Sequence, residues 1–134
     1  MLNPFPSLLV YSFFVPALLR ISASIVFIYM AQYLSRERTK VAALRNVPVV
    51  GKIPEWMVWV SVVITTVVAF CLFIGFMTQW AAIVGMLIAL KHGLATKKYT
   101  PVLPLSRGAY VLLFILCLSL LFSGAGALAF DLPL

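Results

Sequence analysis

Residues Trp56 to Leu90 read WMVWVSVVITTVVAFCLFIGFMTQWAAIVGMLIAL, a run of 35 residues without one Asp, Glu, Lys or Arg. A single helix of this length would measure about 52 Å, whereas the hydrocarbon core of a bilayer is about 30 Å thick. One crossing therefore cannot accommodate the run. Glycine and two polar residues interrupt it at Gly75-Phe76-Met77-Thr78-Gln79. The pattern predicts a transmembrane hairpin that turns at this point.

The composition of the whole chain agrees with that interpretation. The 134 residues are 64% hydrophobic and 10% charged, and the mean hydropathy is +1.14. These values are typical of integral membrane proteins, and the length suits one domain over residues 1–134. A net charge of +7 would suggest nucleic acid as the partner of a soluble protein. Here the positions of the basic residues point to membrane orientation instead, and we expect no nucleic-acid partner.

Two more apolar segments complete a set of four predicted spans. Pro16 suits the first turn of a helix, Trp56 marks a membrane interface, and Ser106 is a suitable N-cap. The sequence therefore predicts an all-α protein, an integral membrane bundle of four transmembrane helices. The expected spans are about 16–34, 56–76, 78–95 and 107–123.

The basic residues orient these spans. The segments 35–55 and 91–107 hold nine of the ten Lys and Arg residues. The first half of segment 35–55 could continue the first helix out of the membrane. We expect the rest of that segment and segment 91–107 to be loops, with His92 at a loop edge facing water. By the positive-inside rule, both loops lie in the cytoplasm and both termini lie outside. The expected location is a prokaryotic inner or plasma membrane.

Small residues recur at every fourth position on two of the predicted helices. They are Ala81, Gly85, Ala89 and Gly93 on the third span, and Ser61, Thr65 and Ala69 on the second. Such faces let helix backbones approach closely in lipid. Packing inside the bundle and docking onto another protein both remain open at this point.

Arg20 is a charged residue within the first predicted span, about one turn inside the outer end of that helix. A charge at that depth is costly unless it is paired or reaches the headgroups. Asp131 is the only acid predicted on the same side of the membrane. The alternatives are an Arg20–Asp131 pair, snorkelling to headgroups, and a ligand or partner contact.

The sequence contains no recognisable catalytic constellation. Cys71 and Cys117 lie in apolar segments without metal-ligand spacing, and His92 has no second ligand nearby in the sequence. Gly124 and Gly126 follow a helix, unlike the glycines of a dinucleotide-binding loop. We therefore predict no catalytic residue, no metal site and no bound cofactor, and the sequence argues against an enzyme.

Three segments resemble the DoxX-like family of small four-helix membrane proteins. They are Arg20 to Phe27 in the first span, Gly75 to Ala82 at the hairpin turn, and Leu121 to Asp131 at the end of the chain. The resemblance covers nearly the whole chain in order. It implies a four-helix fold, and the family takes its name from the small subunit of an archaeal thiosulfate:quinone oxidoreductase.

Departures from the family pattern bear on function. Ser24 and Gln79 replace a family glycine and a family arginine, and Ala125 and Ala129 replace a terminal proline and serine. Thr65 stands where many members carry a glutamate, so no catalytic role is carried over.

Two functions remain. The first is a non-catalytic subunit or accessory component of a larger membrane complex, with the lipid bilayer, other membrane subunits or further copies of itself as partners. The second is a DoxX-type quinone-interacting oxidoreductase subunit, with Arg20 and Asp131 as candidate quinone contacts.

Overall fold

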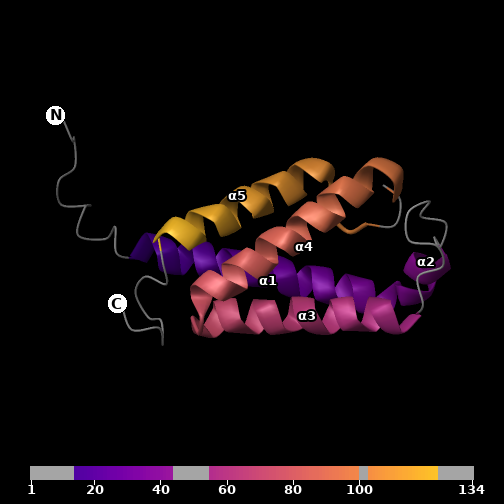
Figure 1. Cartoon of the computed structure of the whole chain (residues 1–134), viewed down its shortest axis with the longest axis horizontal. Coiled ribbons are helices and arrows are strands. Elements are labelled where there is room, and N and C mark those ends of the chain that lie inside the picture. Colours follow the sequence, from indigo (N-terminus) through magenta and orange to yellow (C-terminus); the bar gives the residue numbers. More distant parts are fainter. Residues whose placement is uncertain (1–13, 44–54, 100–102, 124–134) are drawn as a thin grey trace.

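The computed structural model describes residues 14–43, 55–99 and 103–123. Within these ranges there is no strand, and the all-α class is confirmed. In chain order the helices are α1 (Val15–Arg36), α2 (Arg38–Ala43), α3 (Glu55–Ile74), α4 (Thr78–Tyr99) and α5 (Arg107–Ser123). The four long helices lie alongside one another, and the short α2 lies at one end (Figure 1).

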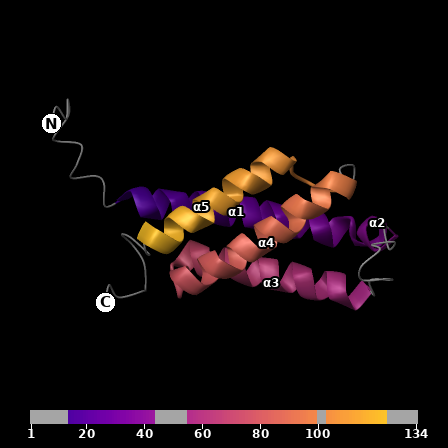
Figure 2. The same cartoon turned by 45° about the horizontal axis from the view of Figure 1, so that its top comes forward.

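The long helices pack as two pairs. α1 packs most extensively against α3, and α4 packs most extensively against α5. Although α3 and α4 are consecutive, they diverge from the turn that joins them (Figures 1 and 2). Side chains from all four helices nevertheless share one core, whose larger members include Phe27, Met30, Leu72, Ile88, Leu113 and Leu120.

The turn between α3 and α4 begins at Gly75, where the sequence predicts the break. Gly75 has a φ of 78°, a left-handed conformation that suits a residue without a Cβ atom. The N–H groups of Gly75 and Phe76 donate to the carbonyl of Cys71 at 2.8 and 3.0 Å. The bond from Phe76, five residues beyond its acceptor, is typical of a helix C-terminus with a left-handed glycine, and α3 ends at Ile74. Met77 also has a positive φ, 47°, and α4 begins at the next residue.

Helix α4 is longer than the sequence analysis predicts. The prediction of a basic loop beginning at Lys91 is wrong, because α4 continues to Tyr99. Lysine is a good helix former, and the first proline beyond this stretch is Pro101. Gly93 weakens a helix in isolation, but here it lies against Tyr110 of α5, which packs close to its backbone.

Helix α5 begins where the sequence predicts a cap. The Oγ atom of Ser106 accepts a hydrogen bond from the N–H of Ala109 at 3.3 Å, and its carbonyl accepts one from Tyr110 at 3.2 Å. A side-chain acceptor at this position satisfies an N–H that has no partner inside the helix. The first turn of α5 is thereby fixed, and Tyr110 faces the core.

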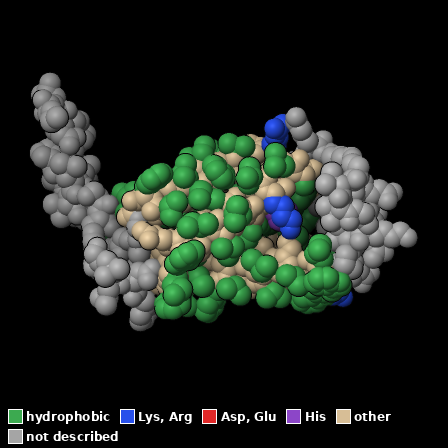
Figure 3. Space-filling model, viewed as in Figure 1, with side chains coloured by type: hydrophobic (Ala, Val, Ile, Leu, Met, Phe, Trp, Pro, Cys, Tyr) green, Lys and Arg blue, Asp and Glu red, His purple; other side chains and the backbone are tan. Residues whose placement is uncertain are grey.

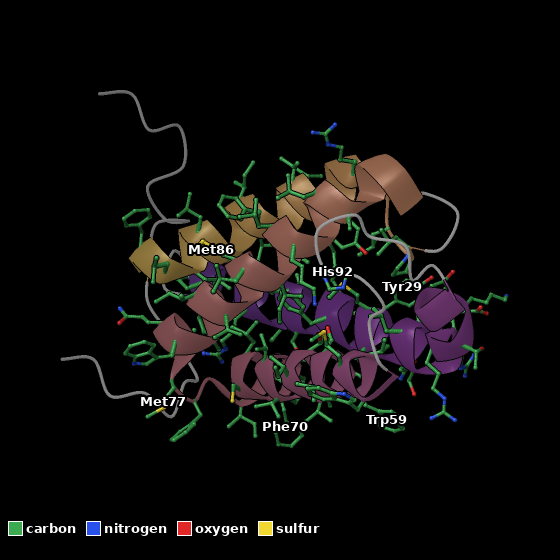
Figure 4. All side chains as sticks on the ribbon, turned by 45° about the vertical axis from the view of Figure 1, so that its right-hand side comes forward. Tyr29, Trp59, Phe70, Met77, Met86 and His92 are labelled. Carbon is green, nitrogen blue, oxygen red and sulfur yellow. The ribbon has the colours of Figure 1, made fainter. Side chains whose placement is uncertain are left out.

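Large apolar side chains lie both in the core and on the outer surface of the bundle. Large apolar residues lie exposed along every long helix, and Figure 3 shows one such hydrophobic face. Among them are Leu18, Ile25, Phe70, Phe73, Trp80, Leu87, Leu112 and Phe122. In Figure 4, Phe70 and Trp59 point outward from α3, whereas His92 lies on the inner side of α4. Among the residues that the structure describes, the buried polar and charged side chains are Arg20, Ser24, Thr65, Thr78 and His92.

Within the described ranges, two helices are long and apolar enough to cross a membrane. By length and composition these are α1 and the segment Trp56–Ile74 of α3. The apolar helix α5 has only 17 residues, and α4 carries several lysines. The structure therefore shows a helical protein in which two helices have the character of membrane spans.

α1 ends, α2 lies and α5 begins at one end of the molecule (Figure 1), and Arg36, Arg38, Lys40 and Arg107 belong to these segments. Arg38 lies over the ring of Trp59, with its guanidinium carbon 5.5 Å from the ring centroid. The ammonium of Lys40 forms an ion pair with Glu37 at 2.7 Å. Glu37 accepts that hydrogen bond and raises the pKa of Lys40 above its ordinary value. The opposite end contains the turn at Gly75 and the last residues of α5.

Candidate functional site

A polar contact joins α3 and α4 in the region where the two helices diverge. The Nζ atom of Lys91 lies 3.4 Å from the Oγ atom of Ser61 and donates to it. One turn along α3, the hydroxyl of Thr65 donates to the carbonyl of Ser61 at 2.8 Å. We define the Lys91 site as Lys91 and Ser61 together with the exposed apolar residues beside them, which are Met57, Ile64, Leu87 and Leu94.

Exposed apolar side chains flank this contact on both helices. Leu87 and Leu94 lie one turn before and one turn after Lys91 on α4. Residues three or four positions apart share one face of a helix, so both leucines adjoin the lysine. Met57 and Ile64 stand in the same relation to Ser61 on α3, and they are exposed as well. An ammonium group and a hydroxyl therefore lie among hydrocarbon side chains.

No described carboxylate neutralises Lys91. The chain has three acidic residues, Glu37, Glu55 and Asp131. Glu37 pairs with Lys40, and this is the one ion pair among the described residues. The side chain of Glu55 and the whole of Asp131 lie outside the described parts of the chain. Within what the structure describes, Lys91 offers an uncompensated positive charge to its surroundings.

His92 lies behind the Lys91 site, inside the bundle. Its side chain is 6% exposed, so the prediction that it faces water is wrong. The Nδ1 atom lies 2.8 Å from the carbonyl of Ile88, and a carbonyl only accepts, so Nδ1 carries the proton. The imidazole stacks on the ring of Tyr110 at 5.9 Å between centroids, with 20° between the planes. This contact connects α4 to α5.

The register of α4 explains why His92 is buried. Gly85 and Ala89 are buried, and His92 follows them at the spacing i, i+4, i+7, which is one face of a helix. This spacing is visible in the sequence and would have predicted a buried His92. It was not used, because the sequence analysis treats the residues from Lys91 onward as a loop. No comparable signal predicts the Lys91–Ser61 contact, because it depends on how far α3 and α4 diverge.

Arg20 lies inside the bundle and not on its surface. It is 2% exposed, and Ser24, one turn further along α1, is fully buried. Ser24 donates a hydrogen bond to the carbonyl of Ala69 at 2.8 Å, which connects α1 to α3. Asp131, the partner predicted for Arg20, falls outside the described residues, so the pair stays a prediction.

The small residues singled out in the sequence face the interior of the bundle. Thr65 and Ala69 on α3 are buried, as are Ala81, Gly85 and Ala89 on α4. Gly93 is half-buried against Tyr110, and Ser61 is half-buried beneath Lys91. The backbone at Gly85 lies close to both Phe27 of α1 and Cys117 of α5.

The remaining chemically capable side chains are dispersed. Cys71 and Cys117 are free thiols. Across the described ranges, no three His, Cys, Asp or Glu side chains gather in a way that would hold a metal ion. The arrangement at the Lys91 site offers hydrogen-bond donors and positive charge, which suit binding of an oxyanion.

Comparisons with protein-family models, with curated proteins and with solved structures found no match for this chain. The DoxX-like resemblance therefore rests on the sequence segments around Arg20, Gly75 and Gly124 alone.

Proposed function

We propose that the chain is a small integral membrane protein in which α1, α3, α4 and α5 all cross the bilayer. In this role it serves as a non-catalytic subunit or accessory component of a larger membrane complex. One observation carries the membrane assignment: polar side chains such as Arg20, Ser24 and His92 are inside, and large apolar side chains are outside. Exposed apolar surface of this extent marks contact with a membrane or with other proteins.

The lengths of α4 and α5 are compatible with this arrangement. At 1.5 Å per residue, the 22 residues of α4 extend about 33 Å and the 17 residues of α5 about 25 Å. Transmembrane helices range from about 17 to 25 residues. Lys97 and Lys98 belong to the last turn of α4.

The gathering of basic residues at one end sets the orientation. Arg36, Arg38 and Lys40 lie at the end that also contains Arg107. The positive-inside rule assigns that end to the cytoplasm of a prokaryotic inner or plasma membrane. Both termini of the chain are then outside.

The buried hydrogen bonds support a structural role for the polar interior. Ser24 donates to the carbonyl of Ala69, and Thr65 donates to that of Ser61. His92 likewise donates to a backbone carbonyl. The Ser24 bond joins α1 to α3, whereas the bonds of Thr65 and His92 lie within α3 and α4. The three side chains do not converge on a common point where a substrate would react. The large apolar residues outside remain available to lipid, to partner subunits or to further copies of the chain.

Cysteine labelling tests the membrane topology. In a background lacking Cys71 and Cys117, single cysteines at positions 40, 98 and 134 would be exposed to a membrane-impermeant thiol reagent added to intact cells. We expect labelling at position 134 only, with the other two labelled after the membrane is opened. Labelling at positions 40 and 98 with protection of 134 would reverse the orientation, and labelling at all three in soluble extract would exclude insertion.

Native mass spectrometry tests the assignment to a complex. Membranes from the source cells would be solubilised in mild detergent, and the species containing this chain would be weighed against its own 14.8 kDa. We expect this chain to occur in a complex of defined mass, whose subunit stoichiometry does not change on dilution. A species of one chain under all mild conditions would contradict a subunit role.

A quinone-interacting role is the second candidate. The position of Arg20 favours it, because a guanidinium inside a membrane bundle is costly and such residues usually serve function. Organic extraction of the purified protein would measure quinone per chain. The quinone role requires about one equivalent in the wild type and its loss in Arg20→Met, whereas the accessory role leaves only the quinone carried over with bulk lipid.

A further inference from the structure

Lys91 and Ser61 lie at similar distances from the ends of their own helices. Lys91 is eight residues from the end of α4 at Tyr99, and Ser61 is six residues from the start of α3 at Glu55. At 1.5 Å per residue these offsets are about 12 and 9 Å. The hydrogen bond between the two side chains therefore lies roughly 10 Å from the basic end of the bundle.

Trp59 relates this depth to the bilayer. Its side chain is exposed on α3, next to the guanidinium of Arg38, as expected of a tryptophan at the level of the headgroups. Ser61 follows two residues later, about 3 Å deeper along the helix. The Lys91 site is therefore at the boundary between lipid headgroups and acyl chains.

The donors at the site suit an oxyanion. A lysine ammonium has three N–H donors, and one of them is directed to Ser61. The hydroxyl of Ser61 accepts that hydrogen bond and retains its own proton for donation. Two donor groups separated by 3.4 Å can contact oxygens of the same phosphate. Lys91 also has no described carboxylate to compensate its charge.

The apolar side chains around Lys91 and Ser61 favour binding of an amphiphile over binding of a free ion. Leu87 and Leu94 are exposed on either side of Lys91, and Ile64 is exposed beside Ser61. A free phosphate would leave these side chains without a partner, whereas a lipid places acyl chains against them. Basic sites between transmembrane helices on the cytoplasmic side are suited to anionic headgroups.

We propose that Lys91 and Ser61 bind the phosphate of an anionic phospholipid of the cytoplasmic leaflet, between α3 and α4. The acyl chains of that lipid lie along Leu87 and Ile64. The inference rests on the proposed membrane function, because a bilayer lipid reaches this site only if the helices span the membrane.

Lipid titration of the delipidated, detergent-solubilised protein tests the site, with native mass spectrometry measuring bound phosphatidylglycerol. We expect Lys91→Met to weaken binding about tenfold, because a charge-assisted hydrogen bond contributes about 1.4 kcal/mol or more and that free energy is tenfold in affinity. Ser61→Ala should weaken it about threefold, and Lys91→Arg should stay within about threefold of wild type. Arg107→Met removes one charge at the basic end and should change binding less than about twofold.

Three results would overturn the proposal. Equal losses in Lys91→Met and Arg107→Met would show a general charge effect. Equal affinity for phosphatidylcholine would show that the site does not select anionic lipid. Competition by millimolar inorganic phosphate, with no advantage for phosphatidylglycerol, would assign the site to free anions. Circular dichroism of each variant verifies that it is folded.

The labelling assay separates failure of this inference from failure of the proposed function. Lys91→Met should keep the cysteine accessibility pattern of the wild type. If that pattern holds and the variant still binds phosphatidylglycerol as tightly as wild type, only the lipid site is wrong. If the cysteine accessibility of the wild type contradicts four membrane spans, the proposed membrane function is wrong, and the lipid site is wrong with it.

Discussion

The ring of Phe27 in α1 occupies the space that a side chain at Gly85 in α4 would need. A Cβ atom at residue 85 would lie 3.0 Å from the Cζ atom of Phe27 and 3.2 Å from the Sγ atom of Cys117. Both distances are tighter than nine in ten of the contacts that real Cβ atoms make, so the neighbouring side chains would have to move by a few tenths of an ångström. Gly85 is therefore the point at which α4 approaches both α1 and α5, and the two helix pairs depend on it for close packing.

Gly85→Ala should lower stability, although alanine is the better helix former. Phe27 and Cys117 are fully buried and have little room to move. Overpacking of this kind costs about 1–3 kcal/mol. Thermal unfolding in detergent measures the loss. Gly108→Ala is the matched control, because a Cβ atom there meets nothing within 4 Å, and it should leave stability unchanged or slightly raised.

A second substitution tests whether Phe27 is the cause. Phe27→Leu should destabilise the wild type by leaving a void, yet cost less in the Gly85→Ala background. Coupling of at least about 0.5 kcal/mol between the two changes is the expected signature of direct contact. Additive losses would mean that the ring does not limit space at residue 85.

Ser24→Ala should loosen the contact between α1 and α3. The hydroxyl donates to the carbonyl of Ala69 at 2.8 Å across the two helices. Its loss should cost about 0.5–1.5 kcal/mol. Ser22→Ala is the control, because the Ser22 hydroxyl is exposed and bonds to Leu18 within its own helix. If both variants unfold at the same temperature, the hydrogen bond between helices contributes nothing measurable.

Arg20 and Asp131 should be energetically coupled. Arg20 is buried, and removing the partner of a buried charge costs about 3–5 kcal/mol, against about 0–1 kcal/mol for an exposed pair. Unfolding of Arg20→Met, Asp131→Asn and the double variant, in detergent and in lipid nanodiscs, measures the coupling. Each single variant should destabilise, and the double variant should be no worse than either. Strictly additive effects would assign Arg20 to a different partner.

Tryptophan quenching by brominated lipids should report the depth of α3. The exposed Trp59 is expected at the headgroups, so bromines near the glycerol should quench a Trp59-only variant best. Ile64→Trp in a background without the three native tryptophans places the probe near the middle of α3, on its exposed side. Bromines deep in the acyl chains should quench that variant best. The same depth profile for both would contradict a membrane-spanning α3.

Local signals in the sequence were sufficient to predict much of the fold. Gly75 ends α3 because it adopts a positive φ, and Ser106 caps α5 because its side chain accepts an N–H bond. Both effects act within a few residues, so they can be read without knowledge of the rest of the chain. The all-α class follows from the length of the apolar runs between such signals.

Relations between helices could not be predicted in the same way. Charge at Lys91 and His92 suggested a loop, but helix propensity and packing against Tyr110 continue α4 past both residues. The contact between Lys91 and Ser61 depends on α3 and α4 diverging, which the connecting turn does not determine. Whether Arg20 meets Asp131 depends on a segment beyond the described residues.

The pairing of α1 with α3 and of α4 with α5 has a consequence for how the protein is made. A ribosome delivers α1 before α3, so the first pair can form while the second is still being translated. Helix α4 emerges before its main partner, and until α5 arrives its small-residue face at Gly85 is only half covered. Completion of α5 is then the event that closes the structure. Cys117 of α5 thereby covers the remaining side of Gly85 only after α4 has been made.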